Sequence, residues 1–396
     1  MSRLACSLRL LRWIGGALAT LCLAAAPAWP QSFLATAFDG DGKFQPISLD
    51  VSADGALIVT GIDSGSSPQF AAVRVARFDA AGRKLWERNP AQRSEFVSTV
   101  IARAAPHGWT AVLHDETPSD SPQMVMLMLD QNGQTLWRRV IGPGAPSDLL
   151  VLADNSLLAA GAANRARGST FEAVVIRVGL DSKPLWRRGL TTGADSGGST
   201  AEVLRVVGDG FLVAGMSDIA YSGDQATASK GWLFRLDGQG KLLWQQSLAG
   251  AAPLTMLSAA VTTQAGDSFA IMLTETASGN QQLDLTKIDP NGKVLWTRPL
   301  AGVPGQEITD MAALADGRLV LVGSEPNGDK RSAIFVEVDS EGIERQRISY
   351  RGYKLARAVS VRIHPLGGFA ILFEGPAGSG FDFTAYVALT DATGRF

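Results

Sequence analysis

Residues 129–137, which read Leu-Asp-Gln-Asn-Gly-Gln-Thr-Leu-Trp, decide the fold of this chain. An aspartate ends one apolar run, a glycine follows three residues later, and a tryptophan opens the next run. Aspartate caps its own turn and glycine accepts a positive φ, so the segment predicts a tight hairpin between two strands. The element recurs at residues 78–86, 236–244 and 288–296, and weaker copies lie at residues 179–186, 339–342 and 391–394.

A second element alternates with the first along the chain. It is a turn followed by an apolar run, as in Ala53-Asp54-Gly55 before residues 56–61. Its further copies begin at His107, Asp154, Asp209, Asp267, Asp316 and Gly367, which makes seven. The tryptophans that close the first element are 51, 49, 58 and 52 residues apart. Self-similarity at this spacing predicts a repeat architecture, and each repeat holds four predicted strands.

The polarity of these strands favours one kind of repeat. In the second repeat the strands are expected at residues 96–104, 109–114, 124–129 and 134–141. The second strand is apolar on both faces, as at residues 157–160 and 319–322, so both faces must be covered. The fourth carries charge, as in Arg138-Arg139, and fits an edge facing water. The prediction is an all-β chain: a seven-bladed β-propeller of four-stranded antiparallel blades.

The tryptophan that opens the fourth strand is interpreted as a packing residue between neighbouring blades. We do not expect it to form a cofactor box or a ligand cage. The five positions concerned are Trp86, Trp137, Trp186, Trp244 and Trp296.

The two ends of the chain are expected to close the ring. The seventh repeat stops at Phe396 before a fourth strand, and an unpaired blade edge is a liability. Residues 43–48 follow a copy of the turn, so this N-terminal strand is predicted to complete the last blade as its outer strand. Residues 33–38 resemble a third strand, and the sequence leaves open whether they compete with residues 386–389 or lie outside the blade.

Residues 1–28 have the pattern of a signal peptide. Arg3, Arg9 and Arg12 precede an apolar stretch that ends in Ala26-Pro27-Ala28. The alternative, a membrane anchor, is disfavoured because the stretch is shorter than the ~20 residues that span a bilayer. Residues 29–396 are then a single propeller domain in the periplasm or outside the cell. Both cysteines, Cys6 and Cys22, lie in the predicted signal peptide, so the mature chain has no thiol chemistry.

Composition excludes two classes of protein. The 396 residues carry a formal net charge of −2, and removal of the signal peptide leaves 33 basic against 38 acidic residues, a net charge of −5. This balance gives no electrostatic footprint for nucleic acid. An apolar content of 46% is too high for a disordered chain.

The repeats resemble those of the pyrroloquinoline-quinone-like β-propeller superfamily. In that family an aspartate, a Gly-Lys pair and a tryptophan recur once per blade, and the tryptophan docks against the neighbouring blade. The residues that match best are Asp237, Gly240, Lys241, Trp244, Asp289, Gly292, Lys293 and Trp296. The resemblance implies the fold over the mature chain. It does not imply the quinone, because the interval from aspartate to tryptophan is one residue shorter and no adjacent cysteine pair exists.

Loop lengths point to one face of the disc as a binding surface. The turns after the first and third strands are tight, whereas the loops after the second strands are long and variable. Variable loops on a rigid scaffold commonly build binding sites. An acidic rim is expected where the second strands enter these loops, at Asp63, Asp115, Glu116, Asp218, Glu275, Glu325 and Glu374. Such a rim would attract a cation, an amine or a basic peptide, although solvated loop ends are the simpler interpretation.

Two further carboxylates, Asp148 and Asp310, occupy equivalent positions on the innermost strand and are expected to line the axial channel. Metal catalysis has little support. His107 and His114 are about 23 Å apart along one strand, and His364 lies in the last repeat. The sequence Asp39-Gly40-Asp41-Gly42 lacks the downstream acid of a calcium loop. No catalytic residue, metal or cofactor is therefore predicted.

These observations predict an exported propeller that acts as a binding or scaffolding module through its long-loop face. We expect a monomer with a protein or peptide partner, without nucleic acid and without a transmembrane segment after signal cleavage. The alternative is an enzyme with its site in the axial funnel, either a quinoprotein-like dehydrogenase or a hydrolase. A close cluster of charged or histidine side chains at the funnel would favour the enzyme.

Overall fold

The structure is a computed structural model. It describes residues 32–39, 43–63, 71–90, 97–117, 122–164, 171–193, 197–222, 225–248, 253–275, 281–376 and 383–396. The predicted signal peptide and parts of the long loops lie outside the described residues, as do Gly40, Asp41 and Gly42.

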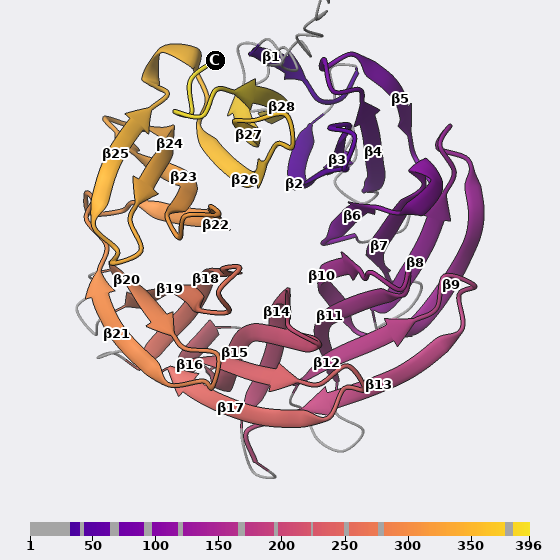
Figure 1. Cartoon of the computed structure of the whole chain (residues 1–396), viewed down its shortest axis with the longest axis vertical. Coiled ribbons are helices and arrows are strands. Elements are labelled where there is room, and N and C mark those ends of the chain that lie inside the picture. Colours follow the sequence, from indigo (N-terminus) through magenta and orange to yellow (C-terminus); the bar gives the residue numbers. More distant parts are fainter. Residues whose placement is uncertain are drawn as a thin grey trace, which may run out of the picture.

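The described chain is built from antiparallel meanders arranged around a central axis, as Figure 1 shows. The innermost strands are β2 (Phe44–Val51), β6 (Val100–Ala104), β10 (Ala145–Val151), β14 (Gly198–Val207), β18 (Leu254–Thr262), β22 (Glu307–Ala313) and β26 (Arg357–Ile363). The second strands are β3 (Leu57–Asp63), β7 (Thr110–Glu116), β11 (Leu157–Asn164), β15 (Gly210–Ser222), β19 (Ser268–Glu275), β23 (Leu319–Asn327) and β27 (Phe369–Pro376).

The outer half of each meander follows the predicted hairpin. The third strands are β4 (Ala72–Phe78), β8 (Gln123–Leu129), β12 (Phe171–Val178), β16 (Gln225–Leu236), β20 (Gln281–Ile288), β24 (Lys330–Val338) and β28 (Phe383–Thr390). The outer strands are β5 (Lys84–Arg88), β9 (Thr135–Pro143), β13 (Pro184–Leu190), β17 (Leu242–Leu248), β21 (Val294–Pro299), β25 (Glu344–Ser349) and β1 (Phe33–Thr36). Two 3-10 turns, η1 (Pro106–Gly108) and η2 (Arg351–Tyr353), complete the described elements.

Hydrogen bonding groups the strands into five sheets of four and one sheet of eight. The large sheet contains two meanders, β14 to β17 and β18 to β21, which a parallel bridge between Ser229 and Leu254 connects. The bridge forms because β16 extends beyond the end of β17, whose last partner is Gly231, and offers a free edge to β18. The sequence does not predict this connection.

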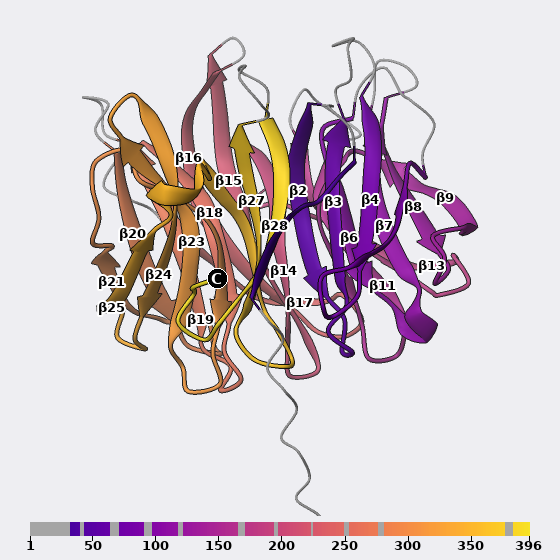
Figure 2. The same cartoon turned by 90° about the horizontal axis from the view of Figure 1, so that it is seen from above.

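The core lies between neighbouring sheets rather than within one of them. Residues 157–160 of β11 are all fully buried. Leu157 and Ala159 pack toward β7 and β8 of the preceding meander, and Leu158 and Ala160 pack toward β15 and β16 of the following one. The apolar second strands are therefore covered on both faces, as the sequence predicts. In the side view of Figure 2 the sheets stand upright around the axis.

The prediction that residues 43–48 form the outer strand of the last blade is wrong. Residues 44–51 form β2, an innermost strand that pairs with β3. The strand beside β28 is β1, with Phe33 opposite Leu389 and Thr36 opposite Tyr386. The reason lies in two aromatic contacts: Phe33 lies against Gly82 of the next turn, and buried Phe38 lies 5.4 Å from the ring of Phe44. These contacts fix residues 33–38 at the outer edge.

The described part of the chain contains no helix that is both long and apolar enough to cross a membrane.

Candidate functional site in the axial channel

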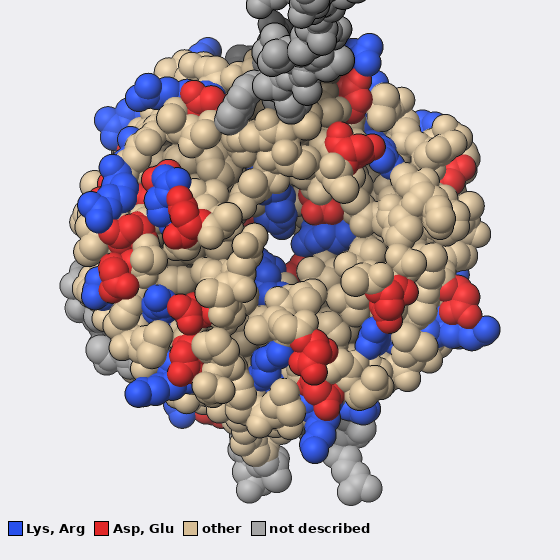
Figure 3. All heavy atoms as spheres, viewed as in Figure 1, with Lys and Arg blue, Asp and Glu red and all other residues tan. Residues whose placement is uncertain are grey.

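The innermost strands surround an axial channel. Figure 3 shows a central opening ringed by Lys and Arg side chains, with acidic side chains between them. A cavity of about 370 Å³ lies in this channel, and its charged lining residues are Asp50, Arg103, Arg205 and Arg362. Ala104, Val151, Ala313 and Ile363 also line it. Each of these four residues pairs with the first residue of a second strand. The cavity therefore lies toward the face of the disc that carries the tight turns between first and second strands.

Asp148 joins three neighbouring innermost strands. The side chain is buried on β10, and Arg103 of β6 binds its Oδ1 at 2.7 Å. On the other side, the backbone N–H of Leu204 in β14 donates to Oδ2 at 2.9 Å, and Arg205 lies 3.3 Å from the same atom. The side chain of Asp148 therefore connects β10 to the innermost strands on both sides of it, β6 and β14.

Asp310 repeats this arrangement between β22 and β26. Its Oδ2 accepts hydrogen bonds from Ser360 Oγ at 2.7 Å and from the backbone N–H of Val361 at 3.1 Å. Arg362 Nη1 lies 2.6 Å from the same oxygen. Burial alone would raise the pKa of Asp310, but the guanidinium groups of Arg362 and Arg205 hold it below its ordinary value.

Asp148 and Asp310 each bind an arginine that lines the cavity and accept a backbone N–H of a neighbouring strand. Neither is among the described residues of the cavity lining, so their place in the channel stays a prediction. A third acid, Asp50 of β2, accepts the backbone N–H of Ala104 at 2.7 Å in the same way. A carboxylate that already accepts several hydrogen bonds is a poor general base, because its lone pairs are occupied.

Two arginines of the channel, Arg205 and Arg362, use only part of their hydrogen-bonding capacity for the neighbouring strands. Nη1 of Arg205 and of Arg362 bonds to the adjacent backbone carbonyl and to an aspartate. Among the described residues, nothing accepts a hydrogen bond from Nη2 of either side chain, and both residues line the cavity. Burial lowers the pKa of Arg205, while Asp148 and Asp310 counteract it. The lumen therefore offers guanidinium donors beside one lining carboxylate, Asp50, while Asp148 and Asp310 bond to the neighbouring strands.

Three of the seven predicted rim acids have structural partners close by. Asp115 is buried, and the backbone N–H groups of Ser98 and Thr99 donate to it, both at 2.9 Å. Glu116 forms an ion pair with Arg138. Glu325 is buried and lies 3.1 Å from Arg351 and 3.5 Å from Arg347.

The other four rim acids also have partners. Asp63 lies 3.7 Å from Arg74, and Asp218 lies 3.0 Å from Lys230. Glu275 accepts from the Gln281 side-chain amide at 3.3 Å, and Glu374 lies opposite Arg357 in the β26–β27 ladder. All seven acids lie on second strands: Asp63, Glu116 and Glu275 are the last residues of theirs, and the other four lie before the strand end. Nearby partners offset much of their charge. The attractive rim stays a prediction.

The histidines do not gather. His364 Nε2 is 3.0 Å from the carbonyl oxygen of Gly55, and His107 lies in η1. His114 is buried, and burial holds the pKa of its imidazole below the ordinary value. Its Nε2 lies 3.6 Å from Glu116, too far for a hydrogen bond. Within the described ranges, no three His, Cys, Asp or Glu side chains are placed to hold one metal ion.

Four of the five repeated tryptophans, Trp86, Trp186, Trp244 and Trp296, lie over glycines of the following turn. A Cβ added to Gly292 would be 2.7 Å from the ring of Trp244, and one added to Gly240 would be 3.0 Å from Trp186. Trp86 Nε1 also donates to the carbonyl oxygen of Gln131 at 2.8 Å. The sequence did not reveal that an arginine two residues after the tryptophan takes part in this contact. Arg188 stacks on the ring of Trp186 and donates to the carbonyl oxygen of Gly240 at 3.1 Å.

Comparison with solved structures identifies the class of protein. Polysaccharide lyase Uly1 has a TM-score of 0.62 at 10% identity, over 90% of this chain and 91% of that one. The β-propeller domain of the Trilobed protease from Pyrococcus furiosus has a TM-score of 0.52 at 9% identity, over 90% and 98%. A puromycin hydrolase mutant complexed with PGG has a TM-score of 0.58 at 14% identity over 91% of this chain. This chain spans 53% of the hydrolase chain.

These similarities show that the chain has a β-propeller fold. No protein-family model matches the sequence. No curated protein matches it either. At identities this low, the similarities carry the fold and not the activity.

Proposed function

We propose that this chain is an exported, non-catalytic binding module whose axial cavity takes a small anion or the acidic side chain of a partner protein. The observation that carries the proposal is the orientation of the channel charges. Arg205 and Arg362 present donors to a cavity of about 370 Å³, and Asp148 and Asp310 are turned to the backbone. Guanidinium groups bind carboxylate and phosphate through paired, charge-assisted hydrogen bonds.

We further propose that the fold is a seven-bladed ring of the pyrroloquinoline-quinone-like kind, closed by the N-terminal strand. Support comes from the pairing of β1 with β28 and from the division of the eight-stranded sheet into two meanders with one bridge. The Trp–Gly contacts between successive turns support the same assignment. We expect the protein to work without pyrroloquinoline quinone.

The enzyme alternative draws on the close charged cluster in the channel. Arg103 lies 2.7 Å from Asp148, and Arg205 lies 3.3 Å from the other oxygen of the same carboxylate. This cluster meets the distance criterion for the enzyme. However, Asp148 already accepts hydrogen bonds from two arginines and two backbone N–H groups, and the described lining of the cavity includes no histidine, cysteine or serine that could serve as a nucleophile or base. Binding is therefore the better supported use.

The test is a calorimetric titration of the full mature chain with inorganic phosphate at low ionic strength. Arg205→Gln should weaken binding by about tenfold or more, because it removes a charge-assisted donor. Arg83→Gln is the matched control, since its side chain is 83% exposed and lies in an outer turn. Equal affinities of the two variants, or no heat with the unchanged protein, would refute the proposed site.

A second probe separates free anions from partner proteins. A short glutamate-rich peptide that competes with phosphate would support an acidic partner side chain. Docking through the long-loop face, a separate prediction, would instead be insensitive to both Arg205→Gln and phosphate.

A further inference from the structure

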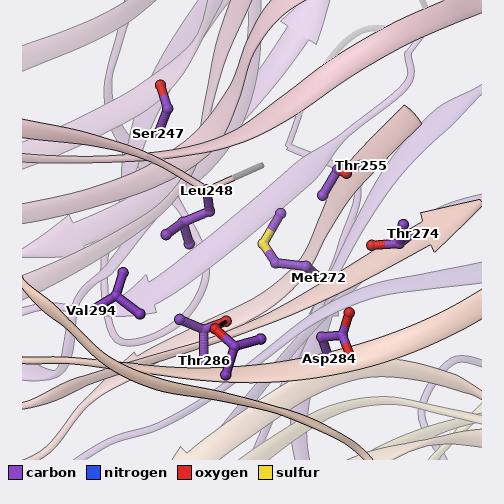
Figure 4. A pocket seen from close by; sticks show the side chains of 9 residues that line it. Ser247, Leu248, Thr255, Met272, Thr274, Asp284, Thr286 and Val294 are labelled. Atoms are coloured by element: carbon purple, nitrogen blue, oxygen red, sulfur yellow. Dashed lines mark hydrogen bonds between the residues drawn. The ribbon is translucent and has the colours of Figure 1, made fainter. Parts of the chain in front are cut away.

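A second cavity, of about 190 Å³, lies between β17 and the meander β18 to β21. Figure 4 shows Met272 in the middle of its lining, with Leu248 and Val294 on one side and Thr274 and Asp284 on the other. Ser247 and Thr297, which are exposed, also line it, so the cavity opens at the outer wall of the ring. It is separate from the axial channel.

The internal repeat shows that this lining is unusual. Asp284 pairs with Met272 across β19 and β20. In each meander, one residue of the third strand occupies the position that Asp284 has in β20. At this position most other meanders have an apolar or aromatic residue. The equivalents of Asp284 are Arg74, Val125, Val174, Trp232, Ile334 and Tyr386.

Thr286, two residues further on, departs in the same way. Its equivalents are Ala76, Leu127, Ile176, Phe234, Val336 and Ala388, all of them apolar. One interface among several similar ones has thus exchanged packed apolar side chains for a polar cavity. Local departures of this kind are expected at functional sites, because they cost packing energy.

The hydroxyl groups of the cavity include one without a partner. Thr274 is 4% exposed, and its Oγ1 has no hydrogen-bond partner among the described residues. A buried hydroxyl in this state is destabilising unless a ligand or water satisfies it. Thr274 lines the cavity beside Thr255, which it faces across the β18–β19 ladder.

The charge of the cavity is negative. Asp284 accepts one hydrogen bond, from the Gln282 side-chain amide at 2.7 Å. The described residues of the lining are Ser, Thr, Leu, Met, Val and this one aspartate, and none of them is a Lys or Arg. A partly buried carboxylate without a cationic partner favours a ligand that supplies the positive charge. The apolar side, formed by Leu248, Met272 and Val294, suits a short hydrocarbon chain.

We propose that this cavity binds a small organic cation, a primary amine with a short aliphatic chain. The ammonium group would lie against Asp284 and the hydroxyls of Thr274 and Thr286, and the methylene groups against Met272. A single carboxylate in a cavity this large does not match the six to eight oxygen ligands that a calcium ion requires. Among the described residues of the lining, no aromatic ring offers a stacking platform for a sugar.

The experiment is an NMR or calorimetric titration of the full mature chain with n-propylammonium chloride, with n-propanol as the uncharged isostere. We expect the amine to bind at least about tenfold more tightly than the alcohol, and Asp284→Asn to abolish this difference. Asp329→Asn is the matched control, because Asp329 is an exposed carboxylate in the turn between β23 and β24. It should leave amine binding unchanged.

A second variant protects the test against misfolding. Asp284→Val installs the residue found at the equivalent position of two other meanders, so it should fold, keep or raise the melting temperature, and lose amine binding. Equal binding of amine and alcohol, or binding that survives Asp284→Val in a folded protein, would overturn the proposal. Preferential binding of calcium or of a monosaccharide would also overturn it, in favour of that ligand.

Discussion

At the residue scale, the channel shows how a shared motif acquires different roles. Asp148 and Asp310 occupy equivalent positions, and each binds arginines together with a backbone N–H of the following innermost strand. Glu202 of β14 is an acid without an arginine partner among the described residues. It follows Ala201 at an irregularity of the β14–β15 ladder, and its Oε1 accepts a hydrogen bond from Thr200 at 2.9 Å. Burial raises the pKa of Glu202 to about 7, against a smaller opposing effect of the Thr200 hydroxyl.

This raised pKa gives a pH-dependent prediction. In the unfolded chain Glu202 ionises near pH 4.5, whereas in the folded protein it ionises near pH 7, so the folded state binds the proton more tightly. Glu202 therefore does not lower the free energy of unfolding below about pH 4, and it lowers this free energy progressively as the pH rises from there to 7. Glu202→Gln should raise the free energy of unfolding by about 1–3 kcal/mol at pH 8 and by much less at pH 5. Chemical denaturation at both values measures this, and an equal effect at pH 5 and pH 8 would contradict it.

At the element scale, neighbouring meanders are joined where a turn meets an outer strand. The turn between β20 and β21 contains Gly292 at a φ of +88°, directly under the ring of Trp244 from β17. Asp289 closes the same turn, since the backbone N–H groups of Asn291 and Lys293 donate to its Oδ1 at 2.9 and 2.8 Å. The turn aspartates are structural, and the glycine permits the tryptophan to approach.

Gly292→Ala tests this contact. A side chain at this φ is strained by about 1–2 kcal/mol, and its Cβ would also displace the tryptophan ring. We expect the melting temperature to fall by a few degrees and the fluorescence of the protein to change as the ring moves. The control is Gly352→Ala, because a Cβ there meets no atom within 4 Å. Similar melting temperatures for the two variants would show that the Trp–Gly contact is dispensable.

At the scale of the whole molecule, the first and last strands of the described chain lie side by side. β1 pairs with β28, and Phe33 lies over Gly82 in the position that tryptophans occupy elsewhere. Phe38 is 2% exposed and packs with Phe44, Leu372 and Val387 in a core shared by the first and last meanders. The two ends therefore depend on each other for burial.

A chain that begins at Asp39 should be much less stable than one that begins at Ser32. Loss of β1 exposes the edge of β28, and loss of Phe38 alone removes a buried ring worth about 3–5 kcal/mol. Calorimetry of the two chains measures the difference. Leu34→Ala in the longer chain serves as control, because Leu34 is 36% exposed. If the shorter chain melts within about a degree of the longer one, β1 does not hold the ring together.

The sequence by itself determined the repeat, because turn chemistry and two-faced apolar strands are local properties. An aspartate and a glycine three residues apart specify a hairpin wherever they occur, and residues 157–160 could not face water. The ring arrangement and the packing role of Trp244 follow from these local facts. The matching contacts of Asp148 and Asp310 on two innermost strands follow from their equivalent positions in the repeat.

Only the tertiary structure decided which residues meet across the repeats. The closing strand was misassigned because residues 43–48 and residues 33–38 both have sequences that suit a strand. Which of the two pairs with β28 depends on contacts of Phe33 with Gly82 and Leu389, which are distant in sequence. The rim acids were recognised, but their cations come from other strands, such as Arg138 for Glu116. Asp284 and Arg205 carry no local signal at all. Each acquires its role from side chains that lie far away in sequence, and contacts of that range are formed by packing and not by pattern.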